Sequence, residues 1–193
     1  MGNTDGMAGV STAKFRCIMD KSNNIGTPVQ TDSSLPESTR RVAALLEAIQ
    51  HDKPIVMLPD TGKTSAEAAL CLGCDVAEIA KSIVFRRLAD DAAVMIVASG
   101  ADRVDEDKVA ALVGPIGKAN ARFVKEKTGY AIGGVCPIGH ITESVVLIDQ
   151  NLFNFASVWA AAGHPHAVFN LTPAQLQSMT GALTVDARLF PQA

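Results

Sequence analysis

The stretch that decides the fold runs from Gly129 to His140 and reads GYAIGGVCPIGH. Its first part, Tyr130–Ile132, is short and apolar, which predicts a strand. Two glycines follow at once, and a proline and a further glycine come within the next five residues. Glycine permits positive φ and close approach of the backbone to another molecule, whereas proline fixes its own φ and restricts the residue before it. The stretch therefore predicts a stiff turn with exposed N–H groups, of the kind that holds a substrate oxygen.

A second element lies upstream, where Lys81 opens the apolar run KSIVF. A lysine at the start of a strand is a compact point charge that suits a phosphate or a carboxylate. Lone lysines are also commonly solvated. The lysine by itself therefore leaves both interpretations open.

Together the two elements resemble the YbaK/prolyl-tRNA synthetase-associated domain family, whose members are aminoacyl-tRNA editing domains and include freestanding deacylases. The family pattern is a lysine that starts a strand and a later GxxxP loop, which correspond here to Lys81 and Gly133–Pro137. The resemblance covers residues 35 to 188. It implies a single α+β domain in which a mixed, strongly curved or barrel-like sheet is surrounded by helices.

The resemblance also implies which residues act. Lys81 would contact a phosphate of the terminal adenosine of a tRNA. Gly133, Gly134 and Pro137 would form the loop whose N–H groups face the ester carbonyl. We expect these four residues to carry the catalysis, without a metal, a cofactor or a covalent intermediate.

Further substrate-binding residues are expected beside them, namely Ser82, Val135, Cys136, Gly139 and His164. His164 lies in the segment AGHPH, which is similar to a Gly–His–Pro segment that lines the pocket of alanine-specific members. Its imidazole would position a water or the amine of the substrate. Cys136 is expected to be a small buried hydrophobe rather than a nucleophile, because nothing in the sequence lowers its pKa.

Two departures from the family bear on the substrate. Ser82 stands where alanine-specific members tend to carry Asn, and no acid lies in Ala167–Phe169, where cysteine-clearing members have one. We expect hydrolysis in trans of mischarged tRNA for proline that carries a small amino acid such as alanine, 2-aminobutyrate or cysteine. The expected partners are the acceptor end of that tRNA and, beyond it, prolyl-tRNA synthetase.

The composition sets limits on other functions. The chain has 193 residues and a net charge of −3, so it gives no overall signal for binding nucleic acid, and DNA is not an expected partner. Contact with tRNA would need a local basic surface, and the candidates are Lys118, Arg122, Lys125 and Lys127, with Arg86 and Arg87. Such residues more often form only a solvated face. No apolar run reaches the ~18 residues that span a bilayer, and no secretory leader is evident. These features predict a cytoplasmic protein.

The chain divides into a flexible extension over residues 1–34, with a short helix over Ala13–Met19, and the editing domain over residues 35–193. Helices are expected over 36–49, 64–72, 75–80, 105–113, 119–127 and 172–179, and strands over 54–58, 82–88, 93–98, 130–132, 145–148, 157–161, 167–171 and 185–189. Residues 114–117 are expected to form a turn only. The helix starts rest on capping residues at Thr64, Asp75, Asp105 and Thr172.

Other interpretations remain open. A binding module of the same fold would hold tRNA or a synthetase without hydrolysis. Cys71 and Cys74 form a CxxC, which is found in thiol-redox proteins, but its position at a helix end favours two packed thiols instead. Asp149 either lines the pocket or caps the turn that follows it.

Overall fold

The computed structural model describes residues 27–29, 35–59 and 64–190. Residues 1–26 and 30–34 of the predicted extension, including the expected helix over Ala13–Met19, lie outside the described residues. Within that extension, Thr27–Val29 form strand β1, which pairs antiparallel with the next strand of the chain.

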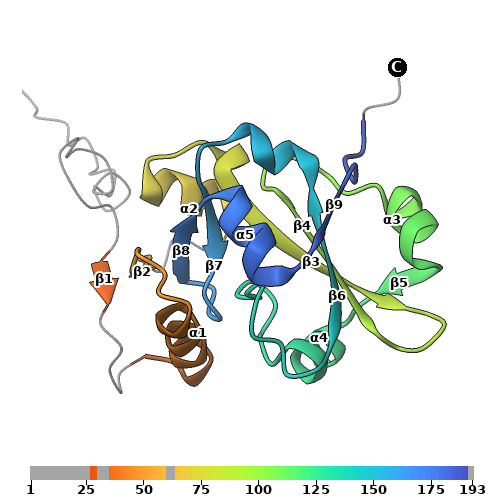
Figure 1. Cartoon of the computed structure of the whole chain (residues 1–193), viewed down its shortest axis with the longest axis horizontal. Coiled ribbons are helices and arrows are strands. Elements are labelled where there is room, and N and C mark those ends of the chain that lie inside the picture. Colours follow the sequence, from red (N-terminus) through yellow and green to blue (C-terminus); the bar gives the residue numbers. More distant parts are fainter. Residues whose placement is uncertain (1–26, 30–34, 60–63, 191–193) are drawn as a thin grey trace, which may run out of the picture.

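The described residues form nine strands and five α-helices (Figure 1). The helices are α1 (Glu37–Ala48), α2 (Ser65–Leu72), α3 (Glu106–Val113), α4 (Ala121–Thr128) and α5 (Pro173–Thr180), with short 3-10 helices η2 (Val76–Glu78) and η3 (Gln150–Asn154). The strands are β1 (Thr27–Val29), β2 (Ile55–Met57), β3 (Ile79–Arg87), β4 (Ala93–Ser99), β5 (Ile116–Lys118), β6 (Ser144–Asp149), β7 (Val158–Ala161), β8 (Ala167–Leu171) and β9 (Leu183–Val185).

All nine strands belong to one mixed sheet, in the order β1-β2-β8-β7-β3-β4-β6-β9, and β5 pairs with β3 off this path. The pairs β3–β7, β4–β6 and β6–β9 are parallel, and the others are antiparallel. β3 and β4 run as long neighbouring strands through the middle of the molecule (Figure 1). The α+β class and the curved mixed sheet surrounded by helices are as predicted.

The helix starts follow from local sequence chemistry. At α2 the Thr64 hydroxyl accepts from the Glu67 N–H at 3.2 Å, and the Glu67 carboxylate accepts from the Thr64 N–H at 2.9 Å. Thr172 and Gln175 close the same reciprocal box at α5, with Pro173 in its first turn. These contacts satisfy N–H groups that have no partner inside the helix.

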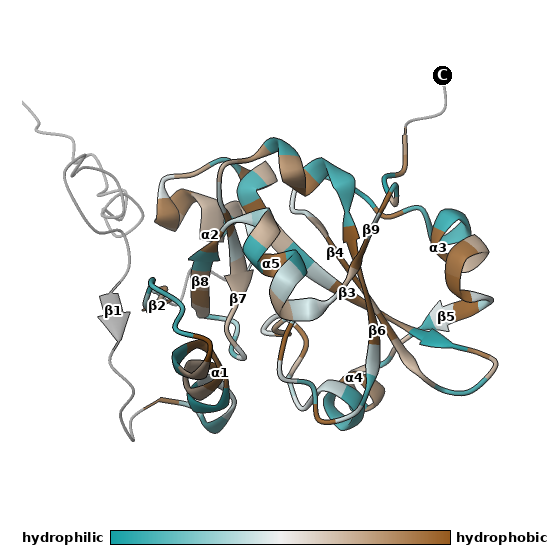
Figure 2. Ribbon diagram, in the orientation of Figure 1, coloured by the Kyte–Doolittle hydropathy of each residue, from teal (hydrophilic) through white to brown (hydrophobic). Residues whose placement is uncertain are grey.

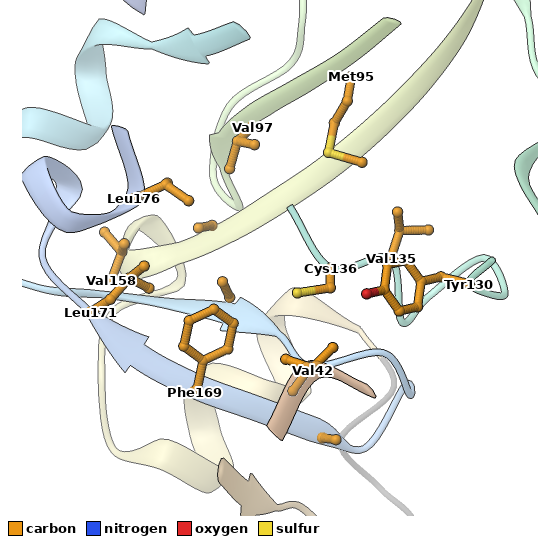
Figure 3. Close-up of a cluster of buried hydrophobic side chains, with 14 of the residues drawn as sticks. Val42, Met95, Val97, Tyr130, Val135, Cys136, Val158, Phe169, Leu171 and Leu176 are labelled. Atoms are coloured by element: carbon orange, nitrogen blue, oxygen red, sulfur yellow. The ribbon is translucent and has the colours of Figure 1, made fainter. Parts of the chain in front are cut away.

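Every residue of β4 is buried, so this strand forms the centre of the core. In Figure 2 the crossing of β3, β4 and β6 is predominantly brown, whereas teal is concentrated on outer helices and turns. One large cluster joins α1, β4, β7 and β8 to the stretch after α4 (Figure 3). Tyr130, Val135 and Cys136 belong to that cluster, so the loop is anchored in the core.

Four predicted elements differ in the structure. The helix expected over 75–80 is only the 3-10 helix η2, and Ile79 and Ala80 already belong to β3. Tyr130–Ile132 is not a strand: Gly129 ends α4 with φ of 77°, and the chain then turns so that the Gly134 N–H donates to the Ala131 carbonyl at 3.0 Å. Ile116–Lys118, expected within or beside a turn, form β5 on β3. The last strand is Leu183–Val185 rather than 185–189.

Asp149 takes the capping role of its two predicted alternatives. Its carboxylate accepts from the N–H groups of Asn151 and Ala187, both at 2.8 Å. Asp149 therefore fixes the start of η3 and holds the segment after β9 against β6.

Candidate functional site

A cavity of about 470 Å³ lies along β3. From β3 come Ile79, Ala80, Lys81, Ser82, Ile83 and Val84, and from the start of α2 come Thr64, Ser65 and Ala68. The facing walls contain Ile132, Gly133, Val135, Trp159, Pro165 and Val168. The cavity thus brings Lys81 and Ser82 together with Gly133 and Val135, four residues that the sequence assigns to one site.

Lys81 is held at the cavity by a neutral partner. Its Nζ donates to the Asp102 carbonyl oxygen at 3.1 Å. Burial lowers the pKa of Lys81, the Asp102 carboxylate opposes that shift, and Arg103 adds to it. Because the ammonium bonds to a carbonyl, its charge remains available to an anion.

Asp102 is itself fixed from behind. Its carboxylate receives the Asn151 Nδ2 at 2.6 Å and the Arg188 Nε at 3.0 Å. The residue is buried. This network connects Lys81 to η3 and to the segment after β9, which the sequence analysis did not foresee.

The glycine loop is fitted closely to the segment after β7. Gly133 has φ of 91°, which favours glycine. A Cβ on Gly134 would lie 2.5 Å from the His164 carbonyl carbon, so only glycine allows this approach. Of the loop residues, Ile132, Gly133 and Val135 line the cavity. Gly134, which the sequence also predicts at the site, is not part of the lining, and its N–H is used inside the turn.

Tyr130 and His140 hold the loop from inside. The Tyr130 hydroxyl donates to the Ile138 carbonyl at 2.8 Å, with the Gly139 carbonyl at 3.2 Å. The His140 Nε2 donates to the Cys136 carbonyl at 2.9 Å. Burial raises the pKa of Tyr130 to about 12 and lowers the pKa of His140. Sequence reasoning gave neither residue a role, although both lie in the stretch it started from.

Three predicted substrate-binding or loop residues lie behind the cavity wall. Cys136 is buried, and burial raises the pKa of its thiol to about 12, so it is protonated at neutral pH. Its side chain lies near Val42 and Tyr130 (Figure 3). Pro137 is buried as well, and Gly139 faces Leu45 and the Tyr130 hydroxyl.

His164 lies at the edge of the site rather than in its lining. Its neighbour Pro165 lines the cavity, and Gly134 packs closely against the His164 backbone. The His164 Nδ1 accepts from the His166 N–H at 3.3 Å, which places the proton of the neutral ring on Nε2. Burial, and then His166, lower the pKa of His164.

Comparison with known proteins identifies the family. A family model for the aminoacyl-tRNA editing domain matches residues 60–179, which is more than half of the chain. The chain belongs to the aminoacyl-tRNA editing domain family. The resemblance to YbaK-like editing domains is thereby confirmed.

Relatives of this editing domain agree with the match. This chain is 34% identical to the uncharacterized protein YwhH of Bacillus subtilis (strain 168) over 118 residues. The aligned region covers 61% of this chain and 74% of YwhH. A solved structure of a candidate trans-editing enzyme for prolyl tRNA synthetase is 40% identical, with a TM-score of 0.76 over 81% of this chain and all (100%) of the other. The structure of the hypothetical protein APE2540 is 28% identical, with a TM-score of 0.72 over 77% of this chain and 99% of APE2540.

Sequence reasoning missed part of the cavity wall of this editing domain. Trp159, the single tryptophan of the chain, lines the cavity from β7. Thr64 and Ser65 line it from the start of α2. The helix cap at Thr64 was visible in the sequence, but its position opposite β3 depends on long-range pairing.

The basic residues singled out earlier are largely engaged on the surface of the domain. Arg122 pairs with Glu126 at 2.7 Å, and the Lys125 Nζ donates to the Gly129 carbonyl at 3.1 Å. Arg86 and Arg87 pair with Asp91 and Asp90 in the turn between β3 and β4. Such exposed pairs contribute little to stability.

Cys71 and Cys74 are placed at the end of α2. Cys71 is buried, and burial raises the pKa of Cys74 to about 11. A raised thiol pKa disfavours the thiolate that redox chemistry requires. In the part of the chain that the structure describes, no cluster of three or more His, Cys, Asp or Glu side chains suits a metal ion. No helix there has the length and apolar character needed to cross a membrane.

Proposed function

We propose that this editing domain is a freestanding deacylase that hydrolyses the ester of mischarged aminoacyl-tRNA in trans. The observation that supports this best is the cavity in which Lys81 of β3 and the loop residues Gly133 and Val135 share one space. The family match and the prolyl tRNA synthetase relative point to the same reaction class.

The chemistry needs little from side chains. A water attacks the carbonyl carbon of the ester, the bond from that carbon to the ribose oxygen breaks, and a proton of the water goes to that oxygen, which becomes a ribose hydroxyl. The Gly133 and Val135 N–H groups would stabilise the oxyanion that forms on the carbonyl oxygen. Removing one such donor typically raises a barrier by about 3–4 kcal/mol. Positioning of an already activated ester contributes much of the remainder.

Lys81 would hold the nucleotide end of the substrate. Its ammonium lines the cavity, and its hydrogen bond to the Asp102 carbonyl at 3.1 Å is to a neutral group. A phosphate of the terminal adenosine would be a stronger partner than a carbonyl, because both groups are then charged. His164, at the rim with its pKa lowered, would orient a water or the substrate amine as a neutral ring.

The substrate we propose is tRNA for proline that carries alanine, 2-aminobutyrate or cysteine. Apolar side chains of Trp159, Val168 and Ile132 line the cavity and suit a small aliphatic group. Such walls separate substrates that differ by one methylene by only about 1–3 kcal/mol, so overlapping substrates are expected. The acceptor end of the tRNA would be the main partner, prolyl-tRNA synthetase a second one, and the cytoplasm the place of action.

The test is release of labelled amino acid from alanyl-, 2-aminobutyryl-, cysteinyl- and seryl-tRNA for proline, with correctly charged prolyl-tRNA as control. We expect rapid loss of one or more of the small amino acids and slow loss of proline. Tight tRNA binding without hydrolysis of any ester would replace the deacylase with a binding module of the same fold.

A further inference from the structure

β3 has an open edge in its middle. On one side β4 pairs with Ala80–Arg86. On the other side β7 pairs only with Ile79 and Ala80, and β5 pairs only with Phe85–Arg87. Between these two contacts, no described strand pairs with residues 81–84 on that side.

The register shows which backbone groups face this gap. Alternate residues of an antiparallel strand bond to the same neighbour. The Gly100 N–H donates to the Ile79 carbonyl at 2.7 Å, and the Arg87 N–H donates to the Ala92 carbonyl at 2.9 Å. Odd-numbered residues of β3 therefore bond to β4. Ser82 and Val84 direct their N–H and C=O groups into the gap.

The gap opens into the cavity. Lys81, Ser82, Ile83 and Val84 all line it. Successive side chains of a strand point to opposite faces of the sheet. A cavity on one face would contact only alternate residues, so a cavity that contacts four consecutive residues runs along the edge of the strand. The Ser82 Oγ itself is buried away from solvent and has no hydrogen-bond partner among the described residues, so this hydroxyl is not counted among the groups that face the gap.

We propose that this open edge of β3 binds the adenine of the terminal nucleotide, a step that rests on the proposed deacylase function. The Ser82 carbonyl accepts from the N6 amino group, and the Val84 N–H donates to N1. These two groups are neighbours on one strand edge, and adenine presents a donor beside an acceptor on its Watson–Crick edge. Enzymes that read an extruded base use that edge in the same way.

Other occupants fit the gap less well. The ammonium of an amino acid has donors only, so it would leave the Val84 N–H without a partner. An added peptide strand needs a continuous free edge, and here β7 and β5 close both ends. Ala119 and Val124 lie beside Val84 in the same apolar cluster and supply a surface for the face of a base. Lys81, one residue before Ser82, supplies the charge for its phosphate.

Binding of short nucleotides tests the proposal without any hydrolysis. Trp159 is the only tryptophan and lines the cavity, so its fluorescence reports occupancy. The probes are the trinucleotide CCA and three analogues whose last base is purine, which lacks the N6 donor, 1-deazaadenine, which lacks N1, or 3-deazaadenine, which keeps both. We expect purine and 1-deazaadenine each to weaken binding about 3–10-fold, the effect of one lost hydrogen bond. The 3-deaza control should bind within about 2-fold of CCA.

A matched pair of variants assigns the effect to the strand edge. Val84→Pro removes an N–H that β4 does not use, a position where a strand tolerates proline. Val84→Ala keeps the N–H and controls for the lost side chain. Val84→Pro should bind CCA and its 1-deaza analogue equally, whereas Val84→Ala should still distinguish them. If Val84→Pro fails to fold, the analogue series with the wild type decides alone.

The outcomes separate this inference from the deacylase. Equal affinity for all four trinucleotides, or no effect of millimolar CCA on Trp159, would overturn adenine recognition by β3. Adenine recognition would also be overturned if an alanyl ester were hydrolysed as fast on a purine-ended tRNA as on the adenosine-ended one. That result would leave the proposed deacylase activity standing. Discrimination among the trinucleotides without hydrolysis of any ester would leave adenine recognition standing and remove the deacylase.

Discussion

At the scale of single residues, the site depends on a few groups whose surroundings permit no substitute. Gly134 has no room for a side chain beside His164. Lys81 depends on Asp102 for both a hydrogen bond and a favourable field. Each of these dependencies predicts a measurable change on substitution.

Gly134→Ala should disable the loop. Its Cβ would come within 2.5 Å of the His164 carbonyl carbon, so the loop must move away from the segment that lines the cavity beside it. We expect deacylation to fall at least about 100-fold, the loss typical of a misplaced oxyanion donor. The control is Gly181→Ala at the end of α5, where a Cβ meets nothing within 4 Å. The φ of 63° at Gly181 makes this variant somewhat less stable, but Gly181 does not line the cavity. Equal activity of the two variants would exclude a catalytic role for the loop.

Asp102→Asn should shift the pH dependence of hydrolysis. The Asp102 carboxylate opposes the lowering of the Lys81 pKa by burial, so its removal lowers that pKa further. If protonated Lys81 holds the phosphate, the enzymatic rate falls as the pH rises through its pKa, and in the variant this fall should begin at a lower pH. Asp186→Asn, which breaks an exposed pair with Lys108, is the control. Rates are to be corrected for spontaneous ester hydrolysis, and unchanged profiles would contradict this role of Asp102.

At the scale of elements, local signals predicted more than long-range ones. The capping residues Thr64, Asp75, Asp105 and Thr172 mark real helix starts, because a cap and its partner lie within one turn. The strand expected at Tyr130–Ile132 is wrong: only Tyr130 of this apolar run is buried in the core, whereas Ala131 and Ile132 are exposed in the turn that the Gly134 N–H closes. Apolar character alone does not distinguish a short strand from a loop.

The loop held by His140 should make stability depend on pH. Burial lowers the pKa of His140 below the ~6.5 of an unfolded imidazole. Between the two values the unfolded chain binds more protons, so stability is complete above about pH 6.5 and is lost as the pH falls toward the folded pKa. Urea unfolding of the wild type should show this loss of stability at low pH. In His140→Gln the loss should be smaller, and what remains should come in part from His164, whose pKa is also lowered. An identical slope in both proteins would contradict the account.

At the scale of the whole molecule, the sequence supported the α+β class but not the order of the strands. β3 meets β7 and β5, which lie far along the chain from it, and those contacts create the open edge at Ser82 and Val84. Periodicity and caps carry no information on such pairing. The lysine and the glycine loop were found through their pattern, whereas the network of Asp102, Asn151 and Arg188 emerges only from the fold.

Removal of residues 1–26 should leave hydrolysis and folding unchanged. Among the described residues, only those from Thr64 onward line the cavity. The truncated chain keeps β1, which covers the edge of β2. The measurement is the hydrolysis rate and the thermal midpoint of the truncated and full chains. A folded but inactive truncated protein would assign the N-terminal segment a part in catalysis or in tRNA binding.

The most direct test of the central claim is single-turnover hydrolysis of alanyl-tRNA for proline by the wild type and by Lys81→Ala. If the cavity between Lys81 and the loop is the deacylase site, the wild type releases alanine rapidly. The folded variant should then lose at least about 100-fold in rate, as expected when a charge that positions the substrate is removed. Equal rates in the two proteins would place the reaction elsewhere, and no release by either would contradict the deacylase itself.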